Sequence, residues 1–194
     1  PDHSAAQNLI ELSKAAGEHG SETFLRLSRD SQGRGLFNWR MFGGNLKENG
    51  DLFASEHLIP GLGDVGAHVS QIMDAGWASF MLSHYVRKAG VFTLPQAIKR
   101  MAADPAAVVG LTDRGILKAG MKADINVFNP AEVTELQPVL VNDFPGGAPR
   151  YIQKARGFKA TLVNGRINVL DGETTGVRAG QVLRHQREFN GATA

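Results

Sequence analysis

A carboxylate and an imidazole make residues 58–68 the first candidate for chemistry in this sequence. The apolar run that begins at Leu58 stops at Gly63 and Asp64, and His68 follows shortly after. This pattern predicts a buried strand that presents Asp64 at its C-terminal end, with glycines that let other groups approach the backbone closely. A carboxylate at such a place can bind a metal, take up a proton or cap the next helix. The spacing alone leaves these roles open.

Arg40 is a second candidate, at the end of the β-like stretch 35–43. A guanidinium can bind a carboxylate through two parallel hydrogen bonds, so Arg40 is a possible contact for an acidic substrate group. The alternative is an ordinary exposed arginine near a strand end. The other histidines are scattered, and His84 is expected to pack or face solvent within a helix rather than bind metal.

The composition is typical of a globular protein with a hydrophobic core. The 194 residues are 42% hydrophobic and 21% charged, with a net charge of +2 and no cysteine. The chain contains no basic run, no apolar run of membrane-spanning length and no signal-like start. We therefore expect a cytoplasmic protein without nucleic-acid or membrane partners and without disulfides or thiolate metal ligands. Because the chain begins with Pro1 rather than Met, we expect a fragment.

Helices and short strands alternate in the first 112 residues. Capping residues, apolar periodicity and Gly or Pro breaks predict helices over residues 5–16, 21–29, 47–56, 69–88, 94–103 and 104–110. Strand-like runs lie at 35–43 and from Leu58. This alternation predicts an α/β fold, the closing units of a parallel layer or barrel. In such barrels the strand ends build the active site, which is where Asp64 is expected.

The pattern becomes β-rich beyond Thr112. Short strands are predicted at 115–117 and 123–128, a loop at 138–150, and a hairpin of strands 159–163 and 166–170 around Asn164-Gly165. These strands are too few to close a sandwich by themselves. We therefore predict two domains, 1–112 and 113–194.

Three separated motifs carry a family resemblance. Residues 115–128 (Gly-Ile-Leu-Lys-Ala-Gly-Met-Lys-Ala-Asp-Ile-Asn-Val-Phe) resemble the C-terminal signature of the amidohydrolase superfamily. Residues 61–68 and 163–184 resemble the N-acyl-D-amino-acid deacylase (D-aminoacylase) branch. The resemblance implies that 1–112 is the C-terminal part of a TIM-like metal-dependent hydrolase barrel. It implies that 113–194 contains the last strands of a small β-sandwich and a tail.

The resemblance also implies a chemistry: hydrolysis of a non-peptide C–N bond, here deacylation of N-acyl-D-amino acids, at a divalent metal, expected to be zinc. It places Asp64 at the metal centre, where the carboxylate takes a proton from metal-bound water and passes one to the leaving amine. His68 matches a Gly-Ala-His element and is expected to orient the loop or contact substrate. Its alternative role is a backbone hydrogen bond at a helix start. The family usually has Ser before the Asp, where Gly63 stands here.

The sequence departs from the family in its metal ligands, because it contains no His-x-His. Most of the metal site and the N-terminal half are missing, so we expect the C-terminal part of a longer enzyme, inactive and metal-free alone. Its expected partners are that N-terminal half, a small N-acyl amino acid or related amide, and further copies of itself in a homo-oligomer. The alternative is a non-catalytic or degenerate module that serves assembly. Asp124, within residues 115–128, is expected to be structural.

An incomplete barrel and sandwich would leave apolar faces uncovered. The residues expected on these faces are Leu36, Phe37, Leu58, Ile59, Leu162 and Val163.

Overall fold

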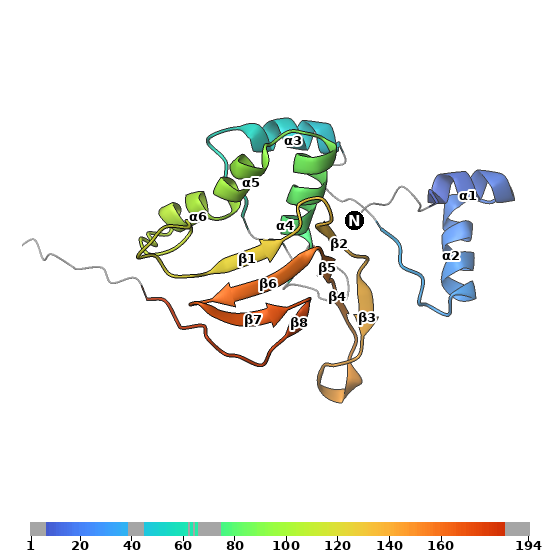
Figure 1. Ribbon diagram of the computed structural model, residues 1–194. Coiled ribbons are helices and arrows are strands. Elements are labelled where there is room, and N and C mark those ends of the chain that lie inside the picture. The colour runs from blue at the N-terminus through green and yellow to red at the C-terminus, as the bar shows by residue number, and fades with distance from the viewer. Residues whose placement is uncertain (1–6, 39–44, 62, 64, 66–74, 185–194) are drawn as a thin grey trace, which may run out of the picture. The chain divides into compact units, whose positions relative to one another are not determined.

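The computed structural model describes residues 7–38, 45–61, 63, 65 and 75–184 of the chain. These residues form a mixture of helix and sheet, with the helices first and the strands after them (Figure 1). The chain divides into two compact units, Asp2–Leu46 and Lys47–Ala194. The predicted boundary at residue 112 remains a prediction for the longer protein.

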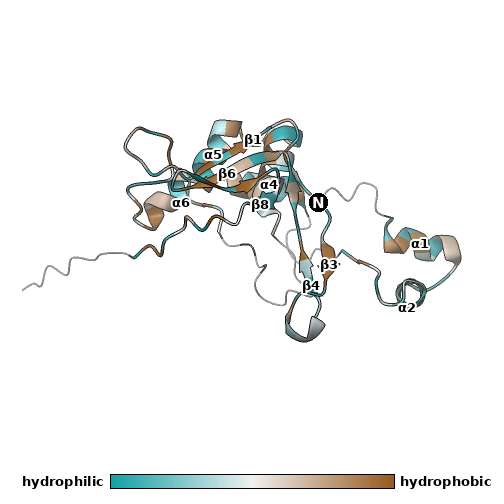
Figure 2. Cartoon of the chain, turned by 60° about the horizontal axis from the view of Figure 1, so that its bottom comes forward, coloured by the Kyte–Doolittle hydropathy of each residue, from teal (hydrophilic) through white to brown (hydrophobic). Residues whose placement is uncertain are grey.

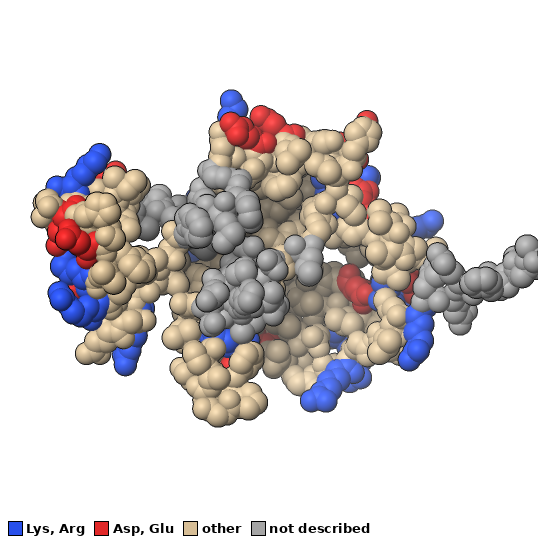
Figure 3. Space-filling view, turned by 180° about the vertical axis from the view of Figure 1, so that it is seen from behind, with Lys and Arg blue, Asp and Glu red and all other residues tan. Residues whose placement is uncertain are grey.

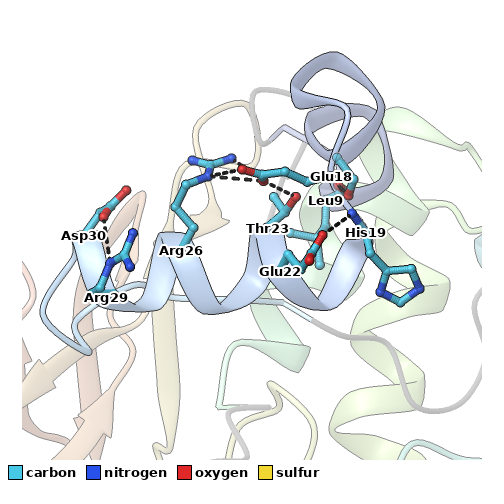
Figure 4. A network of polar contacts seen from close by, with 9 residues as sticks. Leu9, Glu18, His19, Glu22, Thr23, Arg26, Arg29 and Asp30 are labelled. Atoms are coloured by element: carbon cyan, nitrogen blue, oxygen red, sulfur yellow. Dashed lines mark hydrogen bonds and ion pairs between the residues drawn. The ribbon is translucent and has the colours of Figure 1, made fainter.

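The first unit contains α1 (Leu9–Ala16) and α2 (Gly20–Asp30). Asn8 begins α1, because its side chain accepts the Ile10 N–H at 2.8 Å, and Gly17 ends it in a left-handed conformation. The sequence predicted Ser21 as the residue that caps the second helix. Instead, His19 caps α2 through Nδ1, while the Glu22 carboxylate accepts the His19 N–H at 2.9 Å (Figure 4). The cap is therefore a capping box that begins two residues earlier than predicted.

The second unit opens with helices. They are α3 (Leu46–Ala54), α4 (Trp77–Phe80), the π-helix η1 (Met81–Lys88), α5 (Leu94–Met101) and α6 (Ala103–Val108). The Thr93 side chain and Gln96 form a capping box at the start of α5, so the predicted start of a helix at residue 94 is confirmed. Of the helix predicted over 69–88, the described part begins as α4 and continues in π geometry, which periodicity did not indicate.

The strands follow in the order β1 (Ile125–Phe128), β2 (Thr134–Glu135), β3 (Val139–Val141), β4 (Arg150–Ile152), β5 (Ala155–Arg156), β6 (Phe158–Val163), β7 (Arg166–Leu170) and β8 (Glu173–Thr174). A four-stranded antiparallel sheet has the order β1-β6-β7-β8, and β2-β5 and β3-β4 form two smaller sheets. Asn164 and Gly165 both have positive φ, 47° and 77°, between β6 and β7. These angles suit a tight hairpin turn, and the predicted hairpin is confirmed.

Helices and strands of the second unit share one hydrophobic core. Its buried members are Met81, Leu82, Tyr85, Phe92, Ala97 and Val133, and Phe128 and Phe158 of the sheet pack against them. Arg87 of η1 also reaches across, donating to the carbonyls of Pro130 at 3.0 Å and Val133 at 2.8 Å. Apolar residues of the strands and helices are coloured brown in Figure 2. The β-rich segment is therefore packed on the helices rather than separate from them.

Several predicted elements are wrong. Residues 58–61 and 115–117 form no strand, and the described part of 1–112 contains helices but no strand. A parallel strand forms only when a neighbouring strand satisfies its backbone groups, and the described strands pair only with antiparallel partners. The segment 138–150, predicted as a loop, instead contributes β3 and the first residue of β4, on either side of the 3₁₀ turn η2 (Pro145–Gly147). Residues 35–38 are irregular, and 39–44 lie outside the described residues.

The predicted exposure of apolar residues is confirmed at four of the six positions. Leu36, Phe37, Leu58 and Ile59 are 51%, 40%, 40% and 41% exposed. Leu162 and Val163 are half-buried in the sheet. In the described parts of the chain, no helix is long and apolar enough to cross a bilayer.

Candidate functional site

The three residues that the sequence predicted to bind substrate or metal, Arg40, Asp64 and His68, lie outside the described residues. Gly63 and Val65, on either side of Asp64, are half-buried. Described residues before and after Asp64 and His68 in sequence make hydrogen bonds to side chains from distant parts of the chain.

Arg100 of α5 contacts the backbone that precedes Asp64. Its Nη1 donates to the Leu58 carbonyl at 2.8 Å, and its Nη2 donates to the carbonyls of Ala54 at 3.0 Å and Ser55 at 2.8 Å. The guanidinium carbon also lies 5.3 Å from the centre of the Phe92 ring. Carbonyls at the end of a helix lack a partner within that helix, and Arg100 supplies one to the carbonyl of Ala54, the last residue of α3.

A cavity of about 300 Å³ lies beside these contacts. Its walls are Ala54, Glu56, Leu58, Val91, Phe92, Gln96, Lys99, Arg100 and Asp104. Lys99 forms an ion pair with Asp104 at 2.6 Å, and Arg100 binds the three carbonyls. Both basic side chains of the lining therefore already have partners, so neither is available to bind an anion in this cavity.

Gly76 lies after the predicted site residues and begins α4. Its N–H donates to Gln153 Oε1 at 2.8 Å, and the other end of that amide, Nε2, donates to the Leu136 carbonyl at 2.8 Å. A Cβ at Gly76 would lie 2.8 Å from Glu135 Cβ and 2.9 Å from Gln153 Oε1. Only glycine therefore fits where α4 begins against the strands.

Glu135 of β2 is a buried carboxylate that the sequence analysis missed. It is 6% exposed, and Ser83 of η1 donates its hydroxyl to Glu135 Oε2 at 2.9 Å. This hydrogen bond joins the helix to the strand within the shared core, which is a structural role. No local signal could have shown it, because Ser83 and Glu135 are far apart in sequence.

The described residues contain no group of three His, Asp or Glu side chains that could hold a metal ion. The described histidines have other surroundings: His19 caps α2, His57 is 86% exposed, and His84 stacks on Phe80 with ring centroids 4.8 Å apart. His84 also meets Tyr85 edge-on at 5.0 Å, so of the two roles expected for it, packing or facing solvent, the structure shows packing. A complete metal centre would need ligands from outside the described residues.

Asp124 is structural, as predicted. Its Oδ2 accepts from Arg114 Nη1 at 2.7 Å, and its Oδ1 accepts the Asn164 N–H at 2.8 Å. The Asn164 side chain in turn donates to the Ala179 carbonyl, which holds the tail to the β6–β7 turn. On the face shown in Figure 3, basic and acidic side chains are scattered among other residues.

The amidohydrolase family model matches residues 64–169, more than half of the chain, and its match begins at Asp64. The chain belongs to the amidohydrolase family. Within this family it is similar to N-acyl-D-aspartate deacylase of Alcaligenes xylosoxydans xylosoxydans, at 42% identity over 110 residues, which is 55% of this chain and 20% of the relative. D-aminoacylase of the same organism is 36% identical over 109 residues, 55% of this chain and 21% of the relative.

Dihydroorotase of Geobacter metallireducens (strain ATCC 53774 / DSM 7210 / GS-15) is 33% identical over 90 residues, 46% of this chain and 21% of the relative. A crystal structure of D-aminoacylase matches with 34% identity and a TM-score of 0.46, covering 57% of this chain and 21% of that chain. The chain thus spans about a fifth of the length of the relatives it matches.

Proposed function

We propose that this chain is part of a metal-dependent hydrolase that removes the acyl group from N-acyl-D-amino acids. The observation that carries the proposal is the family match over residues 64–169, together with 42% identity to a protein named N-acyl-D-aspartate deacylase. D-aminoacylase and N-acyl-D-glutamate deacylase, each 36% identical, support the same substrate class. Because the matched relatives are named as enzymes, the comparisons do not favour a non-catalytic assembly module.

Asp64 has the main catalytic role in this proposal. An ionised carboxylate accepts a proton from the attacking water and then donates one to the leaving amine. Asp64 is also proposed as a metal ligand, and zinc, when bound, supplies the activation of that water. His68 and Arg40 are proposed to contact substrate, with the Arg40 guanidinium suited to the carboxylate of an amino acid. The described residues contribute no complete ligand set, so the remaining ligands belong to another part of the protein.

The proposal assigns residues 1–112 to the closing part of a barrel and 113–194 to a β-sandwich subdomain with a tail. The mixed helix and sheet, the antiparallel four-stranded sheet and family membership support this assignment. The rest of the protein would then supply the neighbouring strands that residues 58–61 lack, and the coverage of about a fifth of each relative fits this.

Substitution of Asp64 tests the proposal in the full-length protein. Asp64→Asn is expected to lower kcat for an N-acyl-D-amino acid by roughly 10²–10⁴-fold, because the amide cannot transfer the proton. Release of the free amine measures the rate, and circular dichroism checks the fold. Asp124→Asn is the matched control, the same chemical change at a structural carboxylate, and should leave kcat unchanged. Near-normal turnover in Asp64→Asn would contradict the catalytic role and favour the helix cap.

The substrate class needs a separate comparison. The same assay with N-acyl-L-amino acids and with dihydroorotate distinguishes the proposed deacylase from the cyclic-amide chemistry suggested by the name of the dihydroorotase relatives. We expect hydrolysis of the N-acyl-D-amino acid alone, and preferential cleavage of dihydroorotate would contradict the proposal.

A further inference from the structure

An irregular segment, residues 175–184, lies along the outer edge of β7, and we call it the strap. β8 is only two residues long and pairs with Val169 and Leu170, so the rest of this edge has no strand beside it in the described sheet. The strap instead returns along β7 to the end of the sheet that holds the β6–β7 turn (Figure 1). It therefore occupies the place where another strand could pair.

Thr175 begins the strap and satisfies backbone groups of β7. Its N–H donates to the Asn168 carbonyl at 3.0 Å, and its hydroxyl donates to the Ile167 carbonyl at 2.8 Å. The same hydroxyl accepts the Val177 N–H at 3.3 Å. Unpaired N–H and C=O groups on an edge strand are a template for pairing with another chain, so these hydrogen bonds remove part of that template.

Asn164 holds the far part of the strap. Its Nδ2 donates to the Ala179 carbonyl at 2.7 Å. Among the described residues, this is the one hydrogen bond that reaches the strap beyond its first three residues. The backbone of the turn is fixed as well: the Asn164 N–H donates to Asp124 Oδ1 at 2.8 Å, and the Gly165 N–H donates to the Ala123 carbonyl at 2.9 Å. The attachment of the strap thus depends on one side-chain amide.

Asn164 is followed by glycine, and this is the pair in which an asparagine side chain reacts most readily with its own backbone. The Gly165 nitrogen can attack Cγ of Asn164, because glycine has no Cβ to obstruct the approach. The bond from Cγ to Nδ2 breaks, ammonia leaves with the proton of the Gly165 N–H, and a cyclic imide forms. Water then opens the ring and leaves aspartate, or isoaspartate where the main-chain bond is the one that opens. The net change is uptake of water and release of ammonia.

We propose that Asn164 is a modification site at which loss of the side-chain amide releases the strap. A carboxylate has no N–H to donate to the Ala179 carbonyl, so both groups are then hydrogen-bond acceptors. The new negative charge also adds to that of Asp124, whose Oδ1 accepts the N–H of the same residue. Once released, the strap no longer covers the edge of β7, which becomes available to a strand of another chain. This inference is independent of the hydrolase activity proposed above.

The attached strap slows its own release. Both reacting groups of the Asn-Gly pair already have hydrogen-bond partners, so the ring closes only in molecules in which these bonds have opened. The rate of conversion of Asn164 therefore reports how often the strap opens. Thr175→Val keeps the shape of the side chain but removes its hydroxyl, and it should speed the conversion roughly 2- to 10-fold.

Asn164→Asp and Asn164→Gly in the full-length protein test the release directly. Aspartate is the modified side chain, whereas glycine removes the side chain without adding charge and suits the positive φ of this position. Both should raise trypsin cleavage after Arg178 and hydrogen exchange at the Thr175 amide roughly 2- to 10-fold, the effect of losing one hydrogen bond. Asn126→Asp is the matched control: Asn126 Oδ1 accepts from the Thr161 hydroxyl at 2.8 Å, and a carboxylate can still accept there. It should behave as wild type.

Incubation of the wild-type full-length protein at mildly alkaline pH tests the modification itself. Peptide mass spectrometry should find the carboxylate products at residue 164, and molecules that carry them should be cleaved after Arg178 at least as fast as Asn164→Asp. Asn49-Gly50 is the internal control, because it lies within α3 with Gly50 buried. The helix restricts the backbone rotation that ring closure needs, so Asn49 should convert more slowly than Asn164.

Wild-type cleavage and exchange in both Asn164→Asp and Asn164→Gly would overturn the proposal. Faster cleavage in Asn164→Asp alone would overturn it too, because repulsion by Asp124 rather than the lost hydrogen bond would then be responsible. If Asn164→Asp does not fold, Asn164→Gly decides: faster cleavage supports the release, and wild-type cleavage overturns it. Conversion of Asn164 that is no faster than that of Asn49 would show that residue 164 is not a modification site.

Discussion

Glu18 shows how a single residue organises the first unit. Its carboxylate accepts from Arg26 Nε at 2.8 Å and from the Thr23 hydroxyl at 2.7 Å (Figure 4). Thr23 is fully buried and Arg26 lies one turn further along α2. Glu18, which lies between α1 and α2, is thereby joined to two residues of α2. The hydrogen bond from Arg26, followed by that from Thr23, lowers the pKa of Glu18.

This lowered pKa predicts a pH dependence for the helix pair. Because the folded state holds Glu18 ionised to lower pH than the unfolded chain does, the stabilisation is fully present above the unfolded pKa. It is lost as pH falls below about 5 and through the folded pKa. NMR titration should give a Glu18 midpoint below its unfolded value, accompanied by loss of α1–α2 contacts. Glu18→Gln should remove that dependence. A Glu18 midpoint equal to the unfolded value would contradict the prediction.

The sequence could predict the role of a residue when that role depends on near neighbours in the chain or is the usual one for its residue type. Thr93 as a helix cap and Asp124 as a structural residue are examples. Arg100 and Gln153 escaped notice because nothing in their immediate sequence marks a backbone contact more than forty residues away. Their roles arise only when α3, α5 and the strands pack together.

At the scale of elements, local turn chemistry determined which predictions succeeded. Asn164-Gly165 strongly favours a tight hairpin turn between two strand-like runs, so β6 and β7 were predictable. A parallel strand at Leu58 depends on neighbours that are not among the described strands. The β3–β4 hairpin was missed because its many Pro and Gly residues suggested only loop, although they form the turn that pairs Val141 with Arg150.

Gly157 joins β5 to β6 and provides a prediction for this scale. It has φ of 87°, and a Cβ there would lie 2.6 Å from the Val133 backbone nitrogen and Cα. Gly157→Ala should destabilise the chain by about 3 kcal/mol or more, since backbone strain and a clash with backbone add together. Gly172 is the matched control: its φ is 85° but nothing lies near its Cβ position.

Gly172→Ala should therefore cost only about 1–2 kcal/mol, the price of the left-handed conformation. Denaturant unfolding of both variants measures the difference. Equal losses of unfolding free energy in the two variants would show that the close approach of Val133 to Gly157 adds nothing to the cost of the Ala side chain.

At the scale of the whole chain, the metal site is the first property to test. The described residues provide no group of three ligands, and the sequence contains no His-x-His. We therefore expect the isolated chain, after dialysis, to hold far less than one zinc per molecule and to hydrolyse no N-acyl amino acid. The full-length protein should hold metal at a fixed molar ratio to protein. Metal analysis of both proteins tests this, and a tight stoichiometric metal in the isolated chain would contradict the proposed division of ligands.

The outer face of the four-stranded sheet is the second such property. Val127 of β1 and Leu170 of β7 each lie opposite Ala160 of β6 in the register, so the three residues share one face. Val127 and Leu170 are 47% and 49% exposed, and Ile167 beside them is 43% exposed. Phe128 and Phe158 instead pack against the helical core. The sheet therefore has one covered face and one apolar face that has no cover among the described residues.

An apolar face of this kind rarely stays bare in a soluble monomer. The isolated chain should therefore self-associate through it, whereas in the longer protein we expect other strands to cover it. Sedimentation should show a concentration-dependent increase in mass that Ile167→Lys with Leu170→Lys abolishes, because two charges cannot be buried unpaired between sheets. Val182→Lys is the control, since Val182 is 83% exposed in the tail. A wild-type chain that sediments as a monomer and unfolds cooperatively would mean that the sheet needs no cover. The sheet would then give no physical reason to expect covering strands from the rest of the barrel and sandwich.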